Sequence, residues 1–208
     1  MKTLFKSILF VAALLSLAAC GNKNQAANDE AAADTENVVA VDTLLANADN
    51  YVGQTVTIEG ICSHLCKHGG KKAFILGNDQ NTMIRCDGTE EMGWAFPAES
   101  VHKVLRVTGV VKEQRIGEEE VAAMERQHAE QASRIAAEQG QDVAVEFEQK
   151  AAGGCETERK AAGQENIETF AAQMADYRAR IAERNAKEGK PYLSFYAIDA
   201  KNYEIVEE

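Results

Sequence analysis

The sequence predicts a mainly β domain, a small five-stranded barrel with a helical hairpin inserted between strands 4 and 5. Four stretches between residues 54 and 113 alternate apolar and polar residues or are rich in valine, as strands are. A fifth stretch of this kind comes only after residue 190. Between the fourth and fifth lie two segments with the apolar spacing of helices.

The first segment, MKTLFKSILFVAALLSLAAC, has the pattern of a secretory signal. It carries Lys2 and Lys6, then an apolar run from Ile8 to Ala19, and no acidic residue. The apolar run is too short to favour a stable membrane span. We therefore assign residues 1–19 to a signal peptide that is not part of the fold.

The end of this segment, Leu17-Ala18-Ala19-Cys20, resembles the lipobox of bacterial lipoproteins. The resemblance implies cleavage before Cys20, acylation of the Cys20 thiol, and a membrane as partner through the attached lipid. Gly21 is not the aspartate that retains enterobacterial lipoproteins at the inner membrane, so the resemblance favours the outer membrane. We expect a lipid-anchored protein of the cell envelope.

Composition separates a tether from a folded domain. Residues 20–38 are rich in Asn, Ala and acids and have almost no large apolar side chain, which predicts a disordered tether. The domain is expected at 39–208, with its helical insertion at about 113–190, and its length of about 170 residues suits one domain. Loss of the signal with its two lysines changes the net charge from −11 to −13. This charge disfavours nucleic acid as a partner.

The elements of the barrel follow in order along the chain. A short helix is expected at 41–48, with Asp42 near its start, and a second at PAESVHKV, with Pro97 at its first turn. The expected strands are QTVTIEGI, KAFILGN, NTMIRCDG, VLRVTGVVKE and YLSFYAIDAKNYEIV.

Three strands, a short helix, a fourth strand and a late fifth are the order of the OB-fold. The stretches YVGQTVTIEGIC, FILGNDQNTMIRCDG and LRVTGVV are also similar to the bacterial OB-fold class related to anticodon-binding-type nucleic-acid domains. This resemblance covers about residues 41–113 and 191–207. It implies a binding module.

The insertion is predicted to contain two helices, 118–138 and 166–189. The second has apolar residues at the 3-4-3-4 spacing of a coiled coil, at Ile167, Phe170, Met174, Tyr177 and Ile181. The first has a weaker stripe at Val121, Met124, His128 and Ile135. We expect an antiparallel hairpin whose stripes pack internally, with His128 at the surface or in the seam. A protein partner bound by the insertion is the alternative.

Cysteine and histidine alternate in ICSHLCKHGGKK, at Cys62, His64, Cys66 and His68. If the first strand continues past Gly60, these four side chains share the inward face of the strand, because successive side chains alternate sides. Thiolate and imidazole ligands suit Zn²⁺ or Cu(I), so the motif predicts a metal site.

Geometry restricts how such a site is built. Residues i and i+2 of a strand lie about 6.7 Å apart, so four ligands on a straight strand cannot hold one ion. Either the chain bends near Leu65, or some of the four residues join Cys86 from a neighbouring strand. Buried thiols or a disulfide, with incidental histidines, are the alternative, and spacing does not give the connectivity of Cys62, Cys66, Cys86 and Cys155.

The same loop carries a positive patch on an acidic protein, formed by Lys67, Lys71, Lys72 and Arg85. In OB-folds the loop between strands 1 and 2 borders the ligand face, so these residues are candidate ligand-binding groups. A solvated hairpin turn explains the same lysines.

We expect a non-enzymatic binding module, because no catalytic arrangement stands out in the sequence. One alternative is an OB-fold that binds an oligonucleotide or another anionic oligomer. Another is a thiol-redox protein or metallochaperone that uses Cys62 and Cys66.

Overall fold

The computed structural model describes residues 37–67, 69–150 and 155–206, all within the unit Thr35–Glu208. Its barrel strands are hydrogen-bonded in the order β2 (Thr55–Leu65), β3 (Lys72–Leu76), β4 (Met83–Gly88), β6 (Tyr192–Val206) and β5 (Val104–Gly117). Strand β5 pairs again with β2, which closes the barrel. Strands β4 and β6 are parallel, and the other neighbours are antiparallel. The predicted five-stranded OB-like barrel is confirmed.

Shorter elements surround the barrel. Strand β1 (Val38–Ala40) pairs in parallel with β2 outside the closed ring, and helix α1 (Val41–Ala46) follows it directly. Val41 and Leu44 of α1 are fully buried in the barrel core, which explains why the helix docks there. The described ranges also contain the 3₁₀ helices Ala48–Asn50, Glu90–Met92 and Ala98–Ser100.

Alternation along the strands builds the barrel core. The inward residues of β3 and β4 include Ala73, Ile75, Ile84 and Cys86, all buried. Gly60 lies where β2 passes from β5 to β3, and a Cβ there would come within 2.3 Å of the Leu76 carbonyl oxygen. A side chain at this position would push the two strands apart.

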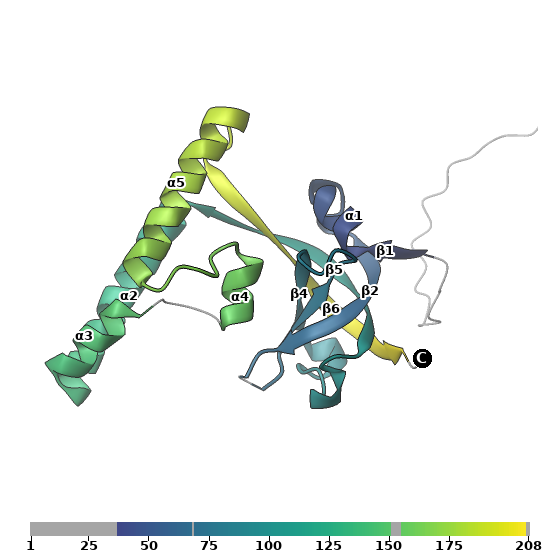
Figure 1. Cartoon of the computed structure of the whole chain (residues 1–208), viewed down its shortest axis with the longest axis horizontal. Coiled ribbons are helices and arrows are strands. Elements are labelled where there is room, and N and C mark those ends of the chain that lie inside the picture. Colours follow the sequence, from purple (N-terminus) through teal and green to yellow (C-terminus); the bar gives the residue numbers. More distant parts are fainter. Residues whose placement is uncertain (1–36, 68, 151–154, 207–208) are drawn as a thin grey trace, which may run out of the picture. The chain divides into compact units, whose positions relative to one another are not determined.

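The insertion stands on an extension of two barrel strands. Strands β5 and β6 stay paired as far as Gly117 and Tyr192, and Figure 1 shows them running as a ribbon to the helices. Four helices lie between them in the described part of the chain: α2 (Glu118–Gln139), α3 (Gln141–Gln149), α4 (Glu156–Ala161) and α5 (Phe170–Glu188). Helices α3 and α4 occupy the segment for which the sequence predicts no helix.

Helices α2 and α5 pack side by side (Figure 1). The Arg178 guanidinium of α5 donates to the carboxylates of Glu118 and Glu125 on α2. Helix α5 begins where the Thr169 hydroxyl accepts from the Ala172 N–H, and it ends at Gly189, whose φ of 70° is left-handed. The antiparallel hairpin is therefore present, because α2 leaves the ribbon and α5 returns to it.

The apolar stripe of α5 forms a second core, separate from that of the barrel. Its buried members are Ile116, Val121, Phe170, Met174, Tyr177, Ile181 and Leu193. Internal packing of the stripe is thereby confirmed. Ile167 precedes α5 and is only partly buried, so the predicted stripe is one residue too long. Within the described residues, the helices lack the length or the apolar content that crossing a membrane requires.

Candidate functional site: a pocket between the barrel and the helical insertion

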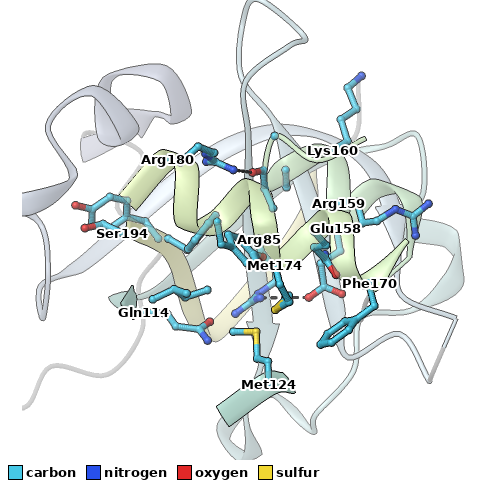
Figure 2. A pocket seen from close by; sticks show the side chains of 18 of the residues that line it. Arg85, Gln114, Met124, Glu158, Arg159, Lys160, Phe170, Met174, Arg180 and Ser194 are labelled. Atoms are coloured by element: carbon cyan, nitrogen blue, oxygen red, sulfur yellow. Dashed lines mark hydrogen bonds and ion pairs between the residues drawn. The ribbon is translucent and has the colours of Figure 1, made fainter. Parts of the chain in front are cut away.

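A pocket of about 900 Å³ lies between the outer face of β3–β4 and the insertion. The barrel contributes Phe74 from β3 and Met83 and Arg85 from β4. All four insertion helices and the ends of β5 and β6 supply the other walls. Figure 2 shows Arg85 of the barrel beside Met124, Glu158 and Met174 of the insertion.

Strand alternation explains why Phe74 and Arg85 face the pocket. Their neighbours in sequence point into the barrel core, and Phe74 and Arg85 are paired across β3 and β4. Directly paired residues project on the same side of a sheet. The two side chains therefore form part of the pocket floor.

Much of the pocket wall is apolar. Its large apolar side chains are Leu45, Phe74, Met83, Ile116, Met124, Phe147, Phe170, Met174 and Phe195. Three of these are methionines, whose unbranched thioether chains adapt to ligands of different shape. The wall is suited to an apolar group.

A cluster of charges fastens α4 to the barrel beside the pocket. Glu158 Oε1 lies 2.7 Å from Lys72 Nζ and 3.3 Å from Arg85 Nη1. Arg85 also contacts Asp87 at 3.0 Å. The Arg85–Glu158 contact is visible in Figure 2. Burial raises the pKa of Asp87, an effect that the charge of Arg85 opposes.

Three enclosed polar atoms of pocket residues have no hydrogen-bond partner among the described residues: His128 Nε2, Arg159 Nε and Gln173 Oε1. The His128 ring is stacked between Phe170, at 3.8 Å between centroids, and Phe147, at 4.6 Å. His128 is thus in the seam of the insertion, as predicted. Buried polar groups ordinarily have partners, so each of these atoms calls for an explanation.

The side chains of the Cys/His motif do not all lie on the inward face of the strand, contrary to the prediction. A bulge lies between Cys62 and His64, which pair with Ile75 and Phe74 on β3. Cys62 therefore points into the barrel core with Ile75, whereas His64 lies on the outer side, with its ring centroid 6.0 Å from that of Phe74. The extra residue, Ser63, donates its hydroxyl to the Phe74 carbonyl. The expectation that His64 shares the inward face with Cys62 is wrong because of this bulge.

The other two residues of the motif, Cys66 and His68, come after the end of β2 in the sequence. Cys66 lies just after β2, partly buried, and His68 lies outside the described residues. In the described ranges, no group of three or more His, Cys, Asp or Glu side chains is arranged to hold a metal ion. Zinc or copper binding by the motif stays a prediction, which the metal content of the purified protein tests.

The buried thiols belong to the barrel core. Burial raises the pKa of both Cys62 and Cys86. Neither of these residues nor Cys155 forms a disulfide. Cys62 and Cys86 thus behave as small apolar residues, in agreement with the buried-thiol alternative.

The predicted ligand-binding cations divide into two groups. Lys67 and Lys71 are exposed in the β2–β3 loop. Lys72 and Arg85 are paired with Glu158 of the insertion. Cys20, the predicted lipidation site, lies outside the described residues.

Sequence reasoning missed the pocket residues Glu158, Arg159 and Gln173. Glu158 and Arg159 are in a segment without apolar periodicity, and Gln173 is a polar residue beside the stripe of α5. A glutamine next to the buried stripe position Met174 was the one available signal. Its buried side chain donates to Gln164 Oε1, on a residue that is nine positions away and lies between α4 and α5.

Comparison with known proteins gives no argument for the fold or the function of this chain. No protein-family model matches the sequence, and no curated protein matches it. Among solved structures, the chain is similar to a protein assigned as an aspartyl-tRNA synthetase from Leishmania major Friedlin. The identity is 15% and the TM-score 0.27, over 41% of this chain and 18% of that one. The fold assignment rests on the strand order.

Proposed function

We propose that this protein is a lipid-anchored binding module of the cell envelope that holds a small ligand in the pocket between β3–β4 and the insertion. In an OB-fold, ligands bind on the face of strands 2 and 3, bordered by the loops between strands 1 and 2 and between strands 4 and 5. Strands β3 and β4 occupy the second and third places in this barrel, and the insertion takes the place of the loop between the fourth and fifth strands. The observation that carries the proposal is that the pocket lies on this face.

The shape and charge of the protein favour a small ligand over an oligonucleotide. A volume of about 900 Å³ is within the range of about 300–1,000 Å³ of small-molecule sites. The insertion covers the barrel face along which a polymer would lie. The net charge of −11 also opposes binding of a polyanion.

The N-terminal sequence supports the place in the cell that we propose for the protein. The signal-like segment and the lipobox-like end at Cys20 support anchoring by acylation at the outer membrane. The acidic, Asn- and Ala-rich residues 20–38 would then connect the anchor to the barrel.

Native mass spectrometry of the protein purified from its own membranes tests the binding function. We expect a small-molecule adduct on the wild type that is lost in Ala161→Trp, because Ala161 lines the pocket and the larger side chain would fill it. Ala137→Trp is the matched control, since Ala137 is exposed on α2 away from the pocket. Absence of an adduct on the wild type, or an adduct that persists in Ala161→Trp, would refute the proposal.

A further inference from the structure

A chain of hydrogen bonds leaves one acceptor of the pocket without a donor. Gln164 Nε2 donates to Asp176 Oδ2 at 2.8 Å, and Gln173 Nε2 donates to Gln164 Oε1 at 2.9 Å. The orientation of both amides is fixed, because a carboxylate only accepts and Asp176 is also paired with Arg180. Turning either amide over would bring two acceptors together. Gln173 Oε1 therefore stays an acceptor without a donor among the described residues, on a side chain that is only 6% exposed.

The cations of the pocket differ in whether an acid neutralises them. Arg85 is paired with Glu158 and Asp87, and Arg180 with Asp176. In the described part of the chain, neither Arg159 nor Lys160 has an ion pair, but Lys160 is exposed and points away from the other labelled side chains in Figure 2, whereas Arg159 Nε is enclosed without an acceptor. Arg159 also borders a second pocket, lined by Glu156, Glu165 and Glu168, without an ion pair to them. The free positive charge of the larger pocket thus lies at α4.

Several aromatic rings of the pocket already contact other side chains. His128 lies between the rings of Phe147 and Phe170, and the Arg180 guanidinium lies over the ring of Phe195 at 5.9 Å. A nucleobase needs an open aromatic face for stacking. Methionine and aliphatic side chains instead offer contact to a flexible apolar chain.

Granted the binding function proposed above, we infer that the ligand is a small amphiphile with an anionic head group that also carries a hydroxyl. Its anion lies at Arg159, its hydroxyl donates to Gln173 Oε1, and its apolar body lies against Met83, Met124 and Met174. This assignment supplies a partner to the unpaired cation and to the unpaired acceptor at once.

Four probes separate the parts of this inference. 3-Hydroxydodecanoate has the anion, the hydroxyl and the chain; dodecanoate lacks the hydroxyl; dodecane-1,3-diol lacks the anion; and 3-hydroxybutyrate lacks the chain. Each is titrated into the full mature protein in a neutral detergent, and native mass spectrometry gives the bound fraction. We expect 3-hydroxydodecanoate to bind tightest. The diol is expected to bind roughly ten- to a hundredfold more weakly, the usual effect of losing a charge-assisted hydrogen bond.

Single-residue variants test which side chains contact the head group of the ligand. Arg159→Gln should weaken binding of 3-hydroxydodecanoate roughly tenfold or more and leave the diol unchanged, whereas Arg126→Gln, at an exposed site on α2, should change neither. Gln173→Met removes the acceptor and keeps the length of the side chain, so it should weaken binding of 3-hydroxydodecanoate and leave binding of dodecanoate unchanged. Retained binding of the diol by Arg159→Gln, and of dodecanoate by Gln173→Met, shows that these variants are folded.

The outcomes distinguish this inference from the binding function. Equal binding of the diol and the hydroxy acid, or unchanged binding in Arg159→Gln, overturns the assignment of the anion. If no probe binds but a native adduct is lost in Ala161→Trp, the ligand class is wrong and the binding function stands. If neither a probe nor an adduct is bound, both are wrong.

Discussion

The separation of the two cores makes a quantitative prediction about local stability. Ile181 of α5 is 8% exposed and packs in the core of the insertion, not in that of the barrel. Ile181→Ala removes three buried carbons, worth about 0.8 kcal/mol each, to which an unfilled cavity adds. We take about 2–3 kcal/mol, because the site is slightly exposed and can partly relax.

This loss should act on the insertion alone. Native-state hydrogen exchange followed by mass spectrometry measures the opening of each segment. A loss of about 2–3 kcal/mol corresponds to roughly 30- to 140-fold faster exchange in α2 and α5. Exchange in β2, β3 and β4 should not change, since their apolar residues belong to the other core.

Leu105→Ala is the matched control, since Leu105 is fully buried in the barrel core. It should speed exchange throughout the barrel, because the closed ring of strands opens as one unit. If Ile181→Ala speeds exchange in β2–β4 as much as in α5, the two cores are one cooperative unit and the reasoning is wrong.

Three further predictions concern single groups. Glu158→Gln should weaken the docking of α4 by about 1 kcal/mol, since its pairs with Lys72 and Arg85 are partly solvent-exposed; unchanged exchange in α4 would contradict this. Because the pKa of Asp87 is raised in the folded protein, its stabilising contribution is present below its unfolded pKa and is lost as pH rises through the folded pKa. The stability of wild type relative to Asp87→Asn should therefore fall over that range in pH-dependent urea unfolding, and a rise would refute the sign. Cys20→Ser should abolish acylation without unfolding the domain, and unaltered partitioning into detergent would count against the anchor.

The fold was predictable because most of it is encoded in local patterns. Strand β6 (Tyr192–Val206) coincides with the predicted stretch, and α2 differs from the prediction by one residue at its end. Strand β1 was not predictable, because its three residues have no periodicity and depend on parallel pairing with β2. Local pattern alone cannot find an element that is created by its partner.

The candidate site was harder to predict from the sequence than the fold was. The physical reason is the same for the Cys/His motif and for the pocket. The alternation of side chains along a strand predicts which face each one occupies only while the strand pairing is regular. One extra residue in β2, Ser63, moved His64 from the inner to the outer face. The contacts of Glu158 join residues 73 and 86 positions apart, so no spacing in the sequence reveals that two predicted ligand-binding cations, Lys72 and Arg85, are already paired. With these two neutralised, the enclosed unpaired cation that lines the pocket is Arg159 of the insertion. The insertion therefore both covers the OB face and supplies the groups that would select what binds there.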